Sequence, residues 1–149
     1  MSVWSQLVGQ NRLRPKLERA ASDPSGSYLF VGPPGVGKAV AARLFAAAQL
    51  CPDACGSCTI CSRVLRGIHP DVQTFEPEGY TYRVEIIREV VASAALSPLE
   101  AERRVFILEE ADRITERSQN ALLKALEEPN PRVTWILLAD SLDPFLPTI

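Results

Sequence analysis

The sequence lacks an excess of basic residues, an apolar run of membrane-spanning length, and any repeat or low-complexity tail. Its 16 Lys and Arg residues are outnumbered by 18 Asp and Glu, which gives a formal net charge of −2. No overall positive field attracts nucleic acid, so direct DNA binding by this chain alone is not expected. Because no membrane span and no signal peptide are visible, we expect a cytoplasmic protein without a membrane partner.

What is present is typical of one folded domain. Of the 149 residues, 46% are hydrophobic and 23% are charged, which suffices for one core. Short apolar segments that read as strands alternate with helical patterns. The expected strands are 27–31, 72–75, 104–108 and 133–139, and the expected helices are 39–50, 84–96 and 118–127. This alternation predicts an α/β fold, a parallel sheet covered by helices on both faces in three αβα layers.

A phosphate-binding loop lies between the first expected strand and the first expected helix. The pattern GxxxxGK is matched by Gly32, Pro33, Pro34, Gly35, Val36, Gly37 and Lys38. In such a loop the backbone N–H groups surround a phosphate, and the lysine reaches the β and γ phosphates. The alternative is a tight proline–glycine turn without a ligand. The complete pattern with both flanking elements favours a site for ATP or ADP.

The residue after the loop departs from the pattern. Ser or Thr normally stands there and ligates Mg²⁺ through its hydroxyl, but this chain has Ala39. A methyl group cannot ligate a metal. The sequence therefore predicts nucleotide binding with slow or absent hydrolysis, and a site where Mg²⁺ is poorly held.

Two acidic residues follow the third expected strand. Glu109 stands where the metal-holding acid of a Walker B element is usually Asp, and Glu110 stands where the second acid orients the attacking water. Glu110 is thus the catalytic candidate if the site is active. The alternative is that both acids only favour the N-terminus of the next helix.

All four cysteines fall within residues 51–61. Cys51, Cys55, Cys58 and Cys61 have the spacing C-x3-C-x2-C-x2-C. Four thiolates in a short loop suit one tetrahedral Zn²⁺, and a site with four protein ligands is structural rather than catalytic. Disulfides would close only very short loops, and a redox pair would leave two thiols unused.

Three features resemble the bacterial clamp-loader subunits of the AAA+ family. The run from Asn120 to Pro129, NALLKALEEP, is similar to that family's NALLKxLEEP signature. Val8, Gly9 and Gln10 resemble its VGQ box, which lies near the adenine. A four-cysteine insert between the first helix and the second strand is also typical of these subunits. The resemblance covers nearly the whole of residues 1–149 and implies one AAA+ nucleotide-binding domain with a zinc insert at 51–61.

Two subunit types share these features, the gamma/tau motor and the delta-prime stator. His69-Pro70-Asp71 and Phe75 to Gly79, together with Ala39 and Glu109, are more similar to delta-prime. The resemblance implies a non-hydrolysing subunit of the DNA polymerase III clamp loader. Its implied partners are gamma/tau and delta, with the sliding clamp and primed DNA reached through the complex.

The end of the chain supports two further expectations. The family's polar sensor residue would be Asp140 or Ser141, after the fourth strand. The chain stops soon after that strand, so we expect a domain truncated before its last strand and lid domain. Two other functions remain as alternatives: an active gamma/tau-like ATPase, and a zinc-dependent nucleic-acid binder, which the acidic balance disfavours.

Overall fold

A computed structural model describes residues 4, 13–22, 26–33, 37–127 and 130–141. The four strands are β1 (Ser27–Val31), β2 (Val72–Phe75), β3 (Arg104–Leu108) and β4 (Val133–Ala139). The five α-helices are α1 (Leu13–Ser22), α2 (Lys38–Leu50), α3 (Thr59–Leu65), α4 (Val84–Ala94) and α5 (Glu116–Glu127). A short 3₁₀ helix, η2 (Ala111–Arg113), follows β3. None of the described helices is long and apolar enough to cross a membrane.

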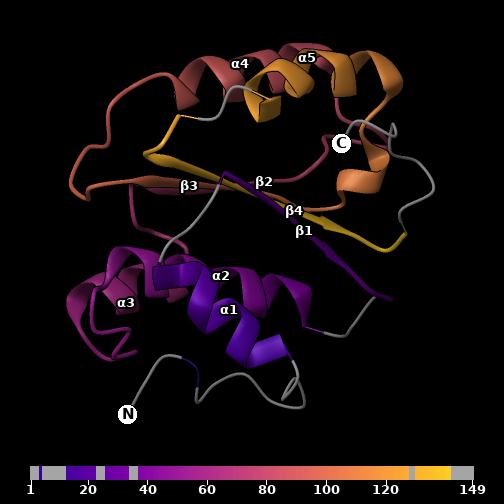
Figure 1. The fold of residues 1–149 in the computed structure, drawn as a ribbon. Helices are drawn as coiled ribbons and strands as arrows, with labels where there is room; N and C mark the ends of the chain where they lie inside the picture. Colours follow the sequence, from indigo (N-terminus) through magenta and orange to yellow (C-terminus); the bar gives the residue numbers. More distant parts are fainter. Residues whose placement is uncertain (1–3, 5–12, 23–25, 34–36, 128–129, 142–149) are drawn as a thin grey trace.

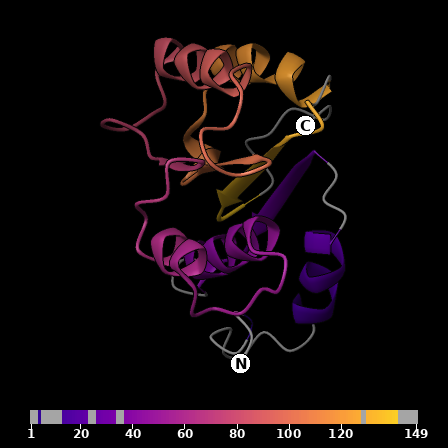
Figure 2. The same cartoon turned by 90° about the vertical axis from the view of Figure 1, so that its left-hand side faces the viewer.

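The strands form one parallel sheet in the order β1-β4-β3-β2. Helices α1, α2 and α3 cover one face, and α4 and α5 cover the other, so three layers are visible (Figure 1). The view turned by 90° shows the same separation of the two helical layers (Figure 2). The predicted α/β sheet with both faces covered is confirmed. In a parallel sheet all strands end at one edge, so the loops after β1, β3 and β4 lie together there.

The two central strands contribute alternate side chains to two separate cores. Val105 and Ile107 of β3 pack with α2 and α3 on one face, whereas Phe106 and Leu108 pack with α4 and α5 on the other. Strand β4 alternates in the same way. Strands buried on both faces are apolar throughout, which is why β3 and β4 read as continuous apolar runs in the sequence.

All four strands have the predicted bounds, but the helices differ in detail. Helix α2 begins at Lys38, α4 ends at Ala94, and α5 begins at Glu116. Strand β1 was expected to be buried, yet both its ends are exposed. Among the described strands β1 pairs only with β4, so it lies at an edge of the sheet. Helices α1 and α3 were not predicted.

Candidate functional site

The four cysteines form a compact cluster at the end of α2 and the start of α3. Cys51 is the C-cap of α2, Cys58 is the N-cap of α3, and Cys61 lies in the first turn of α3. The four sulfur atoms all lie within 4.8 Å of one another. The Sγ of Cys51 is 4.0 Å from that of Cys55 and 3.7 Å from that of Cys58. All four thiols are free.

These distances fit a shared metal ion and not a disulfide. Four thiolates about 2.3 Å from one tetrahedral ion lie about 3.8 Å apart, whereas a disulfide needs about 2.05 Å. The cluster could therefore hold a metal ion such as zinc. Cys51 and Cys61 are buried and belong to the core under α2, so the site is joined to the main fold.

Backbone amides at the cluster favour thiolates. The N–H groups of Ser57 and Cys58 donate to the Sγ of Cys55 at 3.5 and 3.3 Å. These bonds lower the pKa of the Cys55 thiol to about 6. Burial has the opposite effect on Cys61 and raises its pKa. A buried thiolate there requires a cation beside it.

The loop between Cys51 and Cys58 has the backbone that the cluster needs. Gly56 has φ of 80°, a left-handed conformation that glycine adopts without strain. Ala54 also has positive φ, 45°, which costs about 1 kcal/mol for a residue with a side chain. Such a conformation persists only where the surrounding contacts hold it.

The phosphate loop begins at the end of β1 and leads into α2. Gly37 is the N-cap of α2 with φ of 84° and ψ of 28°, and its carbonyl accepts the first helical bond from the Ala41 N–H at 2.9 Å. No atom would contact a Cβ at Gly37 within 4 Å, so the glycine is required by its backbone conformation and not by space. Strand, glycine loop and helix follow one another as predicted.

Lys38 is held by three acceptors. Its ammonium nitrogen Nζ lies 2.5 Å from the Gly32 carbonyl, 3.1 Å from the Pro33 carbonyl and 2.9 Å from Oδ1 of Asp140. The first two acceptors belong to the phosphate loop itself, and the third follows β4. The side chain of Lys38 is only 15% exposed. Its charged end lies beside the residues that follow β1 and β4.

Ala39 occupies the second position of α2 and packs partly against the core under that helix. It presents no oxygen to a metal. The residue that normally anchors Mg²⁺ is thus replaced by an apolar contact.

Glu109 and Glu110 follow β3 at the same edge of the sheet. The carbonyl of Glu109 accepts a bond from the Tyr82 hydroxyl. Glu110 has a left-handed backbone, with φ of 50° and ψ of 46°. Its carboxylate accepts from Nε of Arg113 at 3.3 Å, and Arg113 lies over the Tyr80 ring at 4.6 Å. The candidate catalytic carboxylate is therefore paired with a neighbouring arginine.

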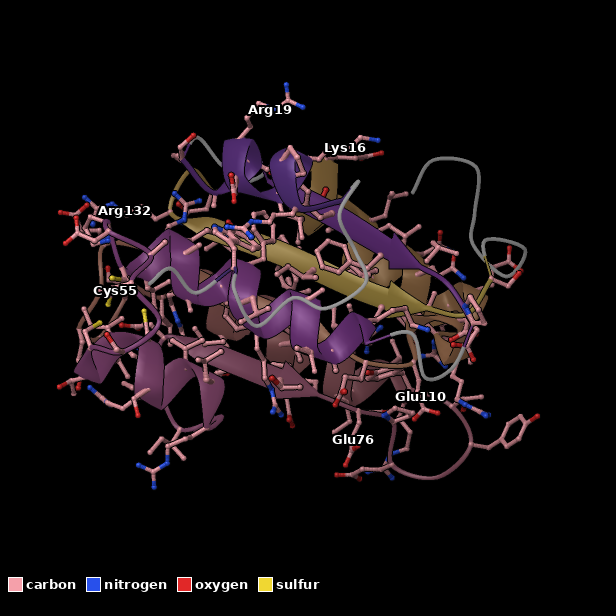
Figure 3. All side chains as sticks on the ribbon, turned by 90° about the horizontal axis from the view of Figure 1, so that it is seen from below. Lys16, Arg19, Cys55, Glu76, Glu110 and Arg132 are labelled. Atoms are coloured by element: carbon pink, nitrogen blue, oxygen red, sulfur yellow. The ribbon has the colours of Figure 1, made fainter. Side chains whose placement is uncertain are left out.

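A hollow of about 370 Å³ lies at this edge. Glu110, Asp112 and Asp140 line it, with Tyr80 and Arg113 on the same wall. Seen from below, Glu76 and Glu110 lie at one end of the molecule, and Cys55 and Arg132 lie at the opposite end (Figure 3). The cysteine cluster is therefore far from the hollow and takes no part in its chemistry.

The structure unites most of the predicted nucleotide-site residues but not all. Gly32 and Pro33 follow β1, and Gly37, Lys38 and Ala39 stand at the start of α2. Glu109 and Glu110 follow β3. Val8, Gly9, Gln10, Pro34, Gly35 and Val36 lie outside the described residues. The partners of Lys38 and Glu110, which are Asp140 and Arg113, were not foreseen. The one signal was the position of Asp140, directly after the fourth strand.

Comparison with known proteins places this arrangement in a family. The family model described as DNA polymerase III, delta subunit, matches residues 9–149. The chain belongs to this DNA polymerase III subunit family. A delta' subunit of Pseudomonas aeruginosa is 34% identical over 155 residues, covering 99% of the chain and 44% of the relative. A delta' subunit of Bacillus subtilis is 31% identical, covering 98% of the chain and 46% of the relative. The chain thus spans less than half the length of these relatives.

A DNA polymerase III gamma subunit and two solved structures are also similar to the chain. A gamma subunit of Buchnera aphidicola is 34% identical over 83% of the chain and 35% of that relative. The crystal structure of a gamma subunit-related protein from Thermotoga maritima has a TM-score of 0.71 and 25% identity, covering 91% of the chain and 42% of that protein. RuvB of Thermotoga maritima has a TM-score of 0.57 at 18% identity, covering 97% of the chain and 43% of RuvB. That likeness shows the fold alone and agrees with the predicted parallel sheet between two layers of helices.

Proposed function

We propose that the chain is the nucleotide-binding domain of a delta-prime-like clamp-loader subunit in DNA replication. In this role it serves as a stator that supports ATP-driven loading of the sliding clamp onto primed DNA. The observation that carries the proposal is a phosphate loop without its metal ligand. Lys38 and the glycines are retained, while the apolar Ala39 stands where a metal-binding hydroxyl would be needed.

Within this role the loop would bind ATP or ADP without turning it over. Glycine-loop backbone and Lys38 suffice for phosphate binding. Hydrolysis needs a metal held between phosphates and protein and a carboxylate free to orient water. Ala39 removes the hydroxyl that would hold the metal, and the Glu110 carboxylate that would orient water is paired with Arg113. Steady ATP turnover by the purified chain that disappears in Lys38→Ala would contradict this part of the proposal.

The proposed partners are the gamma/tau and delta subunits, with the clamp and primed DNA contacted through the assembled complex. The support is the similarity to both delta' and gamma/tau subunits. We expect this chain, within a protein of the length of its delta' relatives, to coelute with gamma/tau in gel filtration at micromolar concentration. Each protein run alone is the control. Separate elution of the two proteins would count against the assignment.

A gamma/tau-like motor is the second candidate, because several gamma and tau subunits are 32–34% identical to the chain. The two candidates differ in one outcome. A motor needs this chain's own site to hydrolyse ATP, whereas a stator needs it at most to bind.

We also propose that the cysteine cluster holds structural Zn²⁺. The support is its four thiols at tetrahedral spacing and its burial against α2. Its position at the end opposite the hollow gives it a role in holding the segment between α2 and α3 (Figure 3).

A further inference from the structure

Each of the three donors of the Lys38 ammonium group has an acceptor among the described residues. An ammonium group carries three N–H donors, and the three oxygens around Nζ are those of Gly32, Pro33 and Asp140. Two of these are neutral carbonyls. The third, at 2.9 Å, is a carboxylate that neutralises the lysine charge. A phosphate that approaches Lys38 must compete with this internal anion.

The sheet fixes the position of Asp140. Ala139 is paired with Val31 at the end of β1 and β4, and the Gly32 N–H donates to the Ala139 carbonyl at 3.1 Å. Asp140 is the next residue. The register therefore places the backbone of Asp140 beside the beginning of the phosphate loop, and the ion pair with Lys38 at 2.9 Å turns its half-exposed side chain toward the loop.

We infer that Asp140 sets the nucleotide specificity of this site: its carboxylate takes the place of the terminal phosphate at Lys38 and so selects a diphosphate over a triphosphate. This inference rests on the proposed nucleotide binding. A lysine in this position normally reaches the β and γ phosphates. With Asp140 beside it, the γ phosphate of ATP would meet a like charge within a few ångströms.

Two further observations strengthen the repulsion. The adjoining hollow is lined by Asp112 as well as Asp140, and by Glu110, whose charge is offset by its pairing with Arg113 in the same hollow. Ala39 offers no hydroxyl to hold the Mg²⁺ that elsewhere offsets such charge. A ligand that ends at the β phosphate brings less charge to this edge than ATP does.

The test is a titration of the 149-residue chain with ADP and with ATP, without Mg²⁺ and at one fixed ionic strength. We expect the wild type to bind ADP more tightly than ATP. Asp140→Asn keeps the size of the side chain but removes its charge. It should tighten ATP binding about 10-fold and change ADP binding by less than about 3-fold. Adding Lys38→Ala to Asp140→Asn should abolish the gain, because the released lysine is what captures the phosphate.

Glu102→Gln is the matched control, since it removes one exposed charge just before β3, at the other edge of the sheet. It should alter neither affinity. The inference would be overturned if Asp140→Asn raised the affinities for ATP and ADP equally, or raised neither. It would also be overturned if neither the wild type nor Asp140→Asn bound either nucleotide. ATP turnover by the wild type would instead contradict the proposed stator role. The ratio of the two affinities would still report on Asp140.

Discussion

Replacing Cys61 by serine is expected to lower the free energy of unfolding by about 4 kcal/mol. Cys61 is fully buried in the core under α2, and its sulfur is one of four that could share a metal ion. The variant leaves three thiols and a buried hydroxyl that binds zinc poorly. The connection from α2 to α3 would then lose the ion that holds its left-handed turns at Ala54 and Gly56.

The measurement is thermal unfolding of protein purified without chelator, together with elemental analysis. We expect one zinc per chain in the wild type and a melting temperature at least about 10 °C lower in Cys61→Ser. Thr59→Ala is the matched control, because its side chain is exposed at the first position of α3, next to Cys58 in the sequence. A wild-type protein that is folded and stable without metal would refute the zinc assignment.

Replacing Asp71 by asparagine is expected to cost about 3 kcal/mol. The Asp71 carboxylate is fully buried and accepts three backbone N–H bonds, from Leu99, Glu100 and Ala101, each at 2.7 Å. It also lies 4.0 Å from Nε of the buried Arg104. An asparagine amide turns one acceptor into a donor, so at least one N–H loses its partner and Arg104 loses its counter-charge.

The loss of stability in Asp71→Asn should be larger at neutral pH than at acidic pH. Burial raises the pKa of Asp71, but the three backbone bonds outweigh it, so the pKa lies below the usual range. A carboxylate with a lowered folded-state pKa contributes stability above the unfolded pKa of about 3.9 and loses it as pH falls through the folded value. The difference between wild type and Asp71→Asn should be full at neutral pH and shrink as the pH falls below about 4.

Urea unfolding at pH 7 and pH 3 measures both expectations. Asp112→Asn makes the same chemical change at a half-buried position in η2 and should alter stability by less than about 1 kcal/mol. A pH-independent difference at Asp71 would show that its charge is not what holds the loop after α4.

The sequence predicted the sheet well because of the way its strands are buried. Strands β3 and β4 are apolar on both faces, and residues that favour turns or solvent bound them, so their limits could be read to the residue. Helix α1 was missed because its pattern is mostly polar and, among its described side chains, only Leu17 is deeply buried. Helix α3 was missed because Cys58 and Cys61 were interpreted only as metal ligands, whereas Cys58 also caps the helix.

The residues of the candidate site could be predicted where they are close together in the sequence. Contacts between residues far apart in the sequence could not. The phosphate loop and the cysteine spacing are contiguous patterns. Asp140 and Lys38 are 102 residues apart, and Asp71 and Leu99 are 28 residues apart. Only the strand order β1-β4-β3-β2 brings such residues together, and no local pattern encodes it. The pairing of Glu110 with Arg113 is local, but its left-handed backbone has no sequence signal.

The stator role is tested most directly by ATP turnover at this site within an assembled complex. The partners would be gamma/tau subunits whose own phosphate-loop lysines have been replaced, so that any hydrolysis must come from this chain. We predict phosphate release at background level, unchanged by Lys38→Ala. Turnover above background that disappears in Lys38→Ala would contradict the account and identify the chain as a motor.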